Sequence, residues 1–276
     1  MKNLLIALAA VLLIIGGTIF WMFQRESDGV PILIYHRVSD TDTNPTTLRV
    51  ADFEQQIKYL ADSGYTAITP DELLDSWQGG RKLPAKPIIL TFDDGHNDIY
   101  NNVLPILQEH NMCATVFIVT NHIGMPQYLS WEQTRLLQGS GLIDIESHTM
   151  SYKNLAALKG DKLWDEIYGS KQAIEWVLKK PAKFIAFPDG KYSVAAEETC
   201  KEVGFRAGFV ADYGLANVNY DSYVLTRIPV QGSNSSTMFR FKLRLNGAPI
   251  FAPLSRLKEH LKNDGNPEIA EFIFIP

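Results

Sequence analysis

The sequence contains little cysteine and no strongly basic segment. Cys113 and Cys200 are the only cysteines among 276 residues, so disulfides do not supply the framework, and we expect two buried thiols, with a single bridge as the alternative. The net charge is −5 and no run of three basic residues occurs, which argues against a nucleic-acid-binding surface. The sequence also lacks a Gly-x-Ser-x-Gly motif and a glycine-rich loop after the first predicted strand. These absences argue against a serine hydrolase and a dinucleotide-binding sheet.

Charge is also missing near the N-terminus. Residues 3–24 carry no charged side chain and, as a helix, would span roughly 30 Å, the thickness of a bilayer core. The apolar region of a cleaved signal peptide is usually shorter, ~7–15 residues, and this run ends in the aromatic pair Trp21 and Phe23, as at a membrane interface. We therefore predict a signal anchor and short linker over residues 1–26, followed by one domain over 27–276 outside the cell. A cleaved signal peptide is the alternative.

Short apolar runs alternate with amphipathic stretches from residue 30 to residue 230. This alternation favours parallel strands, and about eight such units fit a closed barrel or a doubly wound sheet. Because a nucleotide-binding loop is absent, we predict an α/β fold with a distorted (β/α) barrel of seven to eight parallel strands. Residues 239–245 fit both a strand and a helix face, and both remain open. The predicted strands are 30–36, 65–69, 87–92, 113–119, 142–147, 184–187, 206–210 and 224–230, and the predicted helices are 52–63, a short one after Pro70, 98–110, 131–138, 161–179 and 194–203.

Two adjacent carboxylates follow one predicted strand. Asp93 and Asp94 come directly after the apolar run 87–92, at the end of a parallel barrel where functional residues gather. Neighbouring carboxylates repel each other unless a cation or a shared proton lies between them. Asp-Asp-Gly is also a common turn sequence, so a purely structural turn is the alternative. The adjacent pair gives no evidence of the opposed carboxylates that a glycosidase needs.

Other predicted strands also end in polar residues. His148 follows the strand that ends at residue 147, and a histidine at a barrel mouth is suited to bind a metal. Arg227 lies within the last strand, where it would either keep Asp93 ionised or form a purely structural salt bridge. Because the ends of parallel strands meet at one mouth, these residues form a candidate site.

Three segments resemble one known family. Residues 30–36, 91–95 (Thr-Phe-Asp-Asp-Gly) and 225–229 (Leu-Thr-Arg-Ile-Pro) are similar to motifs of the polysaccharide deacetylases with a NodB homology domain, carbohydrate esterase family four. The resemblance covers residues 30–230 and is greatest to the membrane-attached poly-N-acetylglucosamine deacetylases. It implies a NodB-like barrel in which Asp93 is the general base and His36 the general acid. It also implies that Asp94 and His148 bind a divalent metal, zinc first, with cobalt or nickel as alternatives.

Two positions depart from the family pattern. Tyr152 stands where the resemblance implies a second ligand histidine, and a phenol with a pKa of about 10 loses its proton only at a cost of roughly 4 kcal/mol. In the third motif, Asp189 follows Pro188 where the family has an aromatic side chain. Asp189 or His96 would then be a substitute metal ligand, while Pro188 and the backbone near Tyr192 would contact the substrate.

The implied reaction is hydrolysis of N-acetyl groups on an extracellular aminosugar polymer, either poly-N-acetylglucosamine or a peptidoglycan-like glycan. Two alternatives stay open. With only two protein ligands for its metal, the chain would bind polysaccharide or scaffold its synthesis without hydrolysis. Alternatively, the protein would be an O-acetyl esterase, because acetyl esters leave more easily than amides and their hydrolysis tolerates a weaker electrophile. The expected partners are the polysaccharide and, through residues 1–26, the cell membrane, whereas a nucleic acid is not expected and no oligomeric state is indicated.

Overall fold

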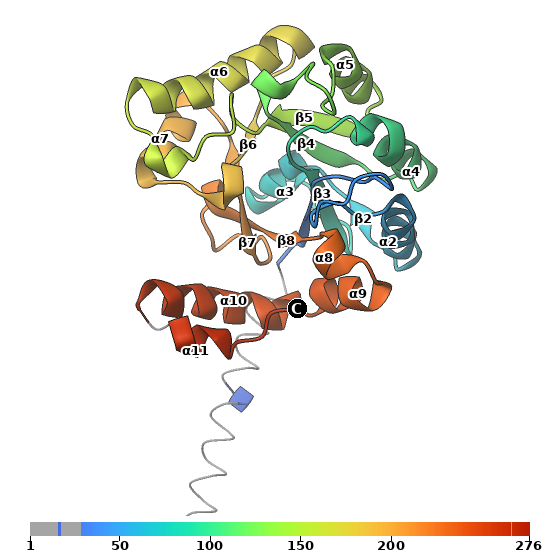
Figure 1. Cartoon of the computed structure of the whole chain (residues 1–276), viewed down its shortest axis with the longest axis vertical. Coiled ribbons are helices and arrows are strands. Elements are labelled where there is room, and N and C mark those ends of the chain that lie inside the picture. The colour runs from blue at the N-terminus through green and yellow to red at the C-terminus, as the bar shows by residue number, and fades with distance from the viewer. Residues whose placement is uncertain (1–15, 18–28, 266) are drawn as a thin grey trace, which may run out of the picture.

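A parallel sheet closes into a barrel at the centre of the molecule (Figure 1). The computed structural model describes residues 16–17, 29–265 and 267–276. In these residues eight strands run in the order β1-β8-β7-β6-β5-β4-β3-β2, and β1 also pairs with β3, so seven strands close the barrel and β2 extends its edge. The predicted α/β barrel is therefore confirmed. The strands are β1 Ile32–Tyr35, β2 Thr66–Ala67, β3 Pro87–Phe92, β4 Ala114–Ile118, β5 Ile143–Ser147, β6 Phe184–Ala186, β7 Ala207–Tyr213 and β8 Leu225–Pro229.

Helices surround the barrel, and a helical C-terminal segment lies to one side of it (Figure 1). The segment that fitted both periodicities is helix α9, because Phe241 and Leu245, four residues apart, are buried on one face. The Phe241 ring meets Tyr59 of α2 with centroids 6.2 Å apart, so packing against α2 decides the structure of α9. The helices are α2 Val50–Asp62, α3 Pro70–Trp77, α4 Leu104–Glu109, α5 Trp131–Gly139, α6 Asp161–Leu178, α7 Val194–Val203, α8 Gly232–Ser235, α9 Met238–Asn246, α10 Ala248–Asn263 and α11 Pro267–Glu271.

Side chains of the strands alternate between two cores. On β3, Leu90 belongs to the core between the strands and the helices, whereas Ile89 belongs to the core inside the barrel, together with Phe117 of β4. Successive side chains of a strand point to opposite faces, so every second residue after Ile89 also points inward. Asp93 is one of these residues. The apolar interior of the barrel thus ends at the mouth in a ring of polar side chains.

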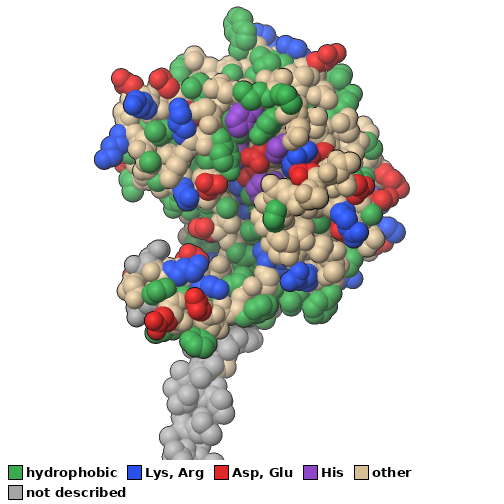
Figure 2. All heavy atoms as spheres, in the orientation of Figure 1, with side chains coloured by type: hydrophobic (Ala, Val, Ile, Leu, Met, Phe, Trp, Pro, Cys, Tyr) green, Lys and Arg blue, Asp and Glu red, His purple; other side chains and the backbone are tan. Residues whose placement is uncertain are grey.

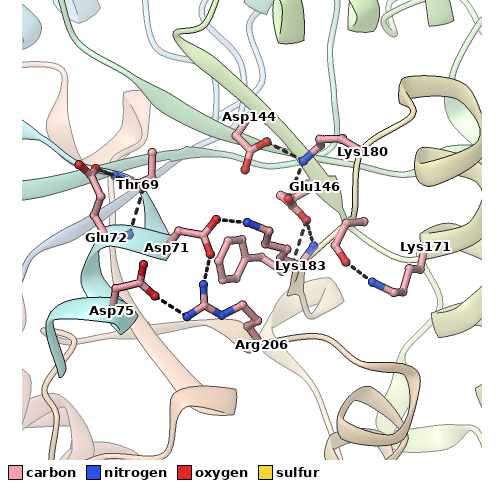
Figure 3. A network of polar contacts seen from close by, with 12 residues as sticks. Thr69, Asp71, Glu72, Asp75, Asp144, Glu146, Lys171, Lys180, Lys183 and Arg206 are labelled. Atoms are coloured by element: carbon pink, nitrogen blue, oxygen red, sulfur yellow. Dashed lines mark hydrogen bonds and ion pairs between the residues drawn. The ribbon is translucent and has the colours of Figure 1, made fainter. Parts of the chain in front are cut away.

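The opposite end of the barrel is closed by α3 and by a network of ion pairs (Figure 3). Two leucines of α3 join the apolar interior, and Asp71 of α3 pairs with Lys183 Nζ at 2.6 Å. Glu146 of β5 is fully buried and accepts hydrogen bonds from Lys180 Nζ at 2.7 Å and from the backbone amides of Lys183 and Phe184 at 2.7 and 2.9 Å. Asp71 and Glu146 therefore have cationic or amide partners at the closed end of the barrel, although burial still raises the pKa of Glu146 to about 8.

The predicted signal anchor lies almost entirely outside the described residues. Gly16 and Gly17 alone represent it, and no helix in the described ranges has the length and apolar character needed to cross a membrane. The anchor and the domain boundary at residue 27 therefore stay predictions.

Both cysteines are free thiols. Cys200 of α7 is buried, whereas Cys113, just before β4, is only partly buried. Burial raises the pKa of Cys200 to about 12 and that of Cys113 to about 11, so neither forms a reactive thiolate at neutral pH.

Candidate active site

Asp93 and Arg227 form a buried ion pair at the mouth of the barrel. Arg227 of β8 donates from Nη1 and Nη2 to the two Asp93 carboxylate oxygens, at 2.7 Å each, and from Nε to the Val210 carbonyl at 2.8 Å. Arg227 is 0% exposed and Asp93 3%. Burial, the largest single influence, raises the pKa of Asp93, but the charge and hydrogen bonds of Arg227, together with His148 and His36, outweigh burial and hold this pKa below its usual value. Asp93 is therefore ionised at neutral pH.

Asp94 and Gly95 turn the chain sharply after β3. Both have a positive φ, 73° and 77°, and a Cβ on Gly95 would come within 2.9 Å of Ile118 Cγ2, so glycine is required there. The turn places the Asp94 carboxylate between two imidazoles: Oδ1 lies 3.6 Å from His148 Nε2, and Oδ2 lies 3.6 Å from His96 Nε2. Burial raises the pKa of Asp94, but the nearby imidazoles outweigh burial and lower this pKa to about 2.

The main chain orients His148. Its side chain is almost fully buried, and Nδ1 lies 2.8 Å from the carbonyl oxygen of Ala186 in β6. A carbonyl oxygen only accepts, so we assign the imidazole proton to Nδ1, which leaves the Nε2 lone pair directed at Asp94. Nε2 also lies 3.8 Å from Asp93 Oδ2. A histidine held in this way is prepared to bind a metal.

His36 follows β1 and faces the same carboxylates. Burial lowers the pKa of His36, while the charges of Asp93 and Asp94 act in the opposite direction without outweighing burial. Its Nδ1 is buried and has no hydrogen-bond partner in the described part of the chain. The ring is thus mostly neutral at neutral pH, and it must gain a proton before it can donate one to a leaving amine.

The Tyr152 hydroxyl is hydrogen-bonded to Asp189. It donates to Asp189 Oδ1 at 3.1 Å, and Lys191 Nζ lies 3.6 Å from Asp189 Oδ2. Burial and the charges of Asp94 and Asp189 raise the pKa of Tyr152 far above its ordinary value, so the phenol stays protonated. Tyr152 and Asp189 both have a positive φ, 59° and 53°, so two strained turns bring them together. A protonated phenol is a poor zinc ligand.

Asp94 and His148 are the two side chains that fit a metal ion best. The 3.6 Å between Asp94 Oδ1 and His148 Nε2 is short enough for both atoms to bind one ion. His96 lies at the other Asp94 oxygen and stacks on Tyr128, with ring centroids 4.7 Å apart. Within residues 16–17, 29–265 and 267–276, no group of three or more His, Cys, Asp or Glu side chains is arranged to hold a metal.

The third predicted motif forms a tight turn after β6. Pro188 is buried, and Tyr192 stacks on Phe187 with ring centroids 5.2 Å apart. The backbone amides of Gly190 and Lys191 donate to carbonyls of the same turn. These two amides are thus occupied and do not form an oxyanion hole as the turn stands.

Two partners in the site were not predicted. Thr91 accepts a hydrogen bond of 3.2 Å from Arg227 Nη1, and the Ala186 carbonyl orients His148. Thr91 lies two residues before Asp93 on the same strand, so strand alternation would have indicated it. The Ala186 carbonyl has no such signal, because every residue carries a carbonyl.

The site opens on one face of the molecule. Figure 2 shows histidine side chains gathered around acidic side chains in a hollow on this face. Ionised carboxylates, an oriented imidazole and a buried arginine at one solvent-reachable mouth suit a reaction that moves protons at a polar substrate.

Known proteins match this chain in sequence. The sequence profile of the polysaccharide deacetylase family matches residues 80–208. The chain is 30% identical over 221 residues to YxkH of Bacillus subtilis (strain 168), a protein assigned by name to the polysaccharide deacetylases, and the match covers 79% of this chain and 77% of that protein. It is 27% identical over 217 residues, 74% of each chain, to the poly-beta-1,6-N-acetyl-D-glucosamine N-deacetylase of Staphylococcus aureus (strain MSSA476).

Solved structures share the fold. The Streptococcus pyogenes deacetylase PplD in complex with acetate matches with a TM-score of 0.72 and 23% identity, over 80% of this chain and 97% of that chain. IcaB from Ammonifex degensii matches with a TM-score of 0.68 and 23% identity, over 82% of this chain and 98% of the IcaB chain. The sequence match to YxkH over most of both chains, together with the family profile, shows that the protein belongs to the polysaccharide deacetylase family with a NodB homology domain, carbohydrate esterase family four.

Proposed function

We propose that this protein hydrolyses the N-acetyl groups of a poly-N-acetylglucosamine polymer. The observation that carries the proposal is the ionised Asp93, held by Arg227, beside the Asp94–His148 pair and His36. Amide hydrolysis needs a base for the attacking water, stabilisation of the oxyanion and an acid for the amine. The name of the S. aureus relative supports poly-N-acetylglucosamine as the substrate.

The side chains divide the reaction between them. The Asp93 carboxylate accepts a proton from water as the water oxygen bonds to the acetyl carbon. His36, once protonated, donates its proton to the nitrogen as the carbon–nitrogen bond breaks, which gives acetate and a free amine. Because Arg227 lowers the pKa of Asp93, this carboxylate is a weak base and needs a water more acidic than bulk water. A divalent metal at Asp94 and His148 would supply that acidity and polarise the carbonyl.

Polysaccharide binding without hydrolysis is the second candidate. The hydrogen bond between Tyr152 and Asp189 favours it, because a protonated phenol held by a carboxylate leaves a metal with two protein ligands. Such a site would hold the ion weakly, and the protein would then bind the glycan without hydrolysing it.

We also propose that the protein acts at the outer face of the cell membrane. The uncharged residues 3–24 support an anchor, and their aromatic end is typical of a membrane interface. The domain would then meet a polymer outside the cell.

Acetate release tests the proposed reaction. Full-length protein in detergent, supplied with zinc or cobalt, is expected to release acetate from poly-β-1,6-N-acetylglucosamine and to leave free amines on the polymer. Enzymatic acetate determination and amine labelling measure the two products. Binding of the polymer with no acetate release would favour the second candidate, and acetate release only from O-acetylated glycans would contradict N-deacetylation.

Tyr152→His is expected to increase zinc affinity at least about tenfold, or ~1.4 kcal/mol, because it supplies a neutral imidazole as a third ligand. Equilibrium dialysis with metal analysis measures this without any need for activity. Tyr152→Phe is the matched control, since it removes the hydroxyl and its bond to Asp189 but adds no ligand. Equal zinc affinity in Tyr152→His and the parent would mean that position 152 does not face the metal.

A further inference from the structure

The turn after β5 joins the candidate metal ligand His148 to Tyr152, and its backbone is strained. Thr149 and Tyr152 have positive φ values of 67° and 59°, in the left-handed region that side chains other than glycine rarely adopt. Thr149 is also branched at Cβ, which disfavours this conformation further. Strained backbone persists only where neighbouring contacts hold it, so the turn needs support from outside itself.

Glu166 of helix α6 contacts this turn at several points. Its carboxylate accepts hydrogen bonds from the Ser151 backbone amide at 2.8 Å, from the Ser151 hydroxyl, and from Lys153 Nζ at 2.7 Å. Its backbone carbonyl accepts a further hydrogen bond from the Met150 amide at 3.0 Å. Met150, Ser151 and Lys153 are therefore all fixed to one residue of the neighbouring helix.

The Glu166 carboxylate is buried and ionised. The residue is 1% exposed, so its charge requires hydrogen-bond partners. Burial raises the pKa of Glu166, but the hydrogen bonds from Lys153 and Ser151 outweigh burial and hold this pKa below its usual value. At neutral pH both carboxylate oxygens therefore act as acceptors, and three donors of the turn converge on them.

The same face of α6 lies close against the turn and the end of β5. Gly169 and Ser170 stand three and four residues after Glu166, so they share its face of the helix. A Cβ on Gly169 would lie 3.0 Å from Met150 Sδ, and Ser170 Oγ lies 2.6 Å from Ser147 Oγ. Because these contacts flank Glu166, its carboxylate is held in place as firmly as the turn that it binds.

We propose that Glu166 is a positioning residue for the candidate metal centre: it holds the turn so that the side chain at position 152 faces the same ion as His148. The inference rests on the proposed function for the presence of that ion. The rings of His148 and Tyr152 meet edge to face with centroids 5.2 Å apart, which brings position 152 beside the candidate ligand. Glu166 is not itself a ligand and acts through residues 150–153.

A double-mutant cycle on zinc affinity tests this role in the full-length protein. Tyr152→His in the parent is expected to increase zinc affinity at least about tenfold. In a Glu166→Ala background, where the turn loses its hydrogen bonds to the carboxylate, the same substitution should increase it less than about threefold. Glu166→Gln can still accept from the Ser151 amide and should give an intermediate gain. Asp165→Ala, at an exposed position on α6, is the control and should leave the full gain.

Equilibrium dialysis with metal analysis measures each single and double variant. A structural role alone would lower zinc affinity by the same factor with tyrosine or histidine at position 152, so an equal gain in the parent and in both Glu166 backgrounds would overturn the proposal. No gain in any background would overturn it as well. If Glu166→Ala does not fold, an undiminished gain in Glu166→Gln decides against the proposal by itself. A gain that depends on Glu166, with no acetate release from the parent, would support the positioning role and reject the deacetylase reaction.

Discussion

Asp93→Asn is expected to lower kcat/KM for acetate release from poly-β-1,6-N-acetylglucosamine about a thousandfold, or ~4 kcal/mol of transition-state stabilisation. The carboxamide fills nearly the same space but cannot take a proton from water. Arg227 already holds the carboxylate in its ionised form, so the parent needs no deprotonation step before it acts as a base. The rate is measured at neutral pH with saturating metal.

Two controls separate the chemistry from the fold. Asp165→Asn changes an exposed carboxylate on α6 and should leave the rate within a factor of about two. The Asp93→Asn variant should still bind zinc, because Asp94 and His148 are the side chains placed to bind the ion. Equilibrium dialysis measures this binding. A loss of less than about tenfold would remove Asp93 from the role of general base and make His36 the next candidate.

Strand alternation explains why much of the site was predictable. Asp93 and His148 stand just beyond the ends of apolar runs, Arg227 lies within the last strand, and the barrel brings these strands to one mouth. The pairing of Arg227 with Asp93 was one of the two predicted roles of this arginine, and the barrel explains it, because a buried carboxylate on an inner face needs a cation from another inner face.

Contacts between turns were not predictable in the same way. Tyr152 and Asp189 are 37 residues apart and meet because both occupy left-handed turns after different strands. A left-handed conformation at a residue other than glycine has little sequence signal, since side-chain sterics disfavour it everywhere. The sequence thus indicated that Tyr152 departs from the family pattern, but not that its hydroxyl is held by Asp189.

The helical segment after the catalytic turn shows a similar limit. Residues 98–110 were predicted as one helix, yet Ile99–Val103 forms a π turn before α4 begins. A π turn adds one residue to a turn of helix, so it shifts Asn101 and Asn102 relative to an ideal α-helix. Asn102 of this turn donates to the Val38 carbonyl at 2.8 Å, a contact with a distant segment that no local sequence pattern contains.

Arg227→Met is expected to lower the free energy of unfolding by about 3–5 kcal/mol at pH 7, because it leaves the buried Asp93 carboxylate without its counterion. The loss should depend on pH. In the parent, the pKa of Asp93 in the folded state lies below its unfolded value of about 3.9. The ionised carboxylate therefore contributes to stability above about pH 3.9, and this contribution is lost only as the pH falls through the folded-state pKa. In the variant, burial loses its strongest opposing charge, with only His148 and His36 left to oppose it, so this pKa rises and stability is lost as the pH rises. The difference between the two proteins should therefore be largest at neutral pH and smallest near pH 4, as urea unfolding at both values would measure.

A double variant and a surface control make this test specific. Asp93→Leu combined with Arg227→Met removes both charges and should recover most of the lost stability, because an apolar pair does not leave a charge buried alone. Arg206→Met breaks the partly exposed pairs with Asp71 and Asp75 at the closed end of the barrel, and it should cost no more than about 1 kcal/mol. If Arg227→Met cost no more than Arg206→Met, or if the double variant were no more stable than Arg227→Met alone, the ion pair would not be what holds the ionised Asp93 in the barrel.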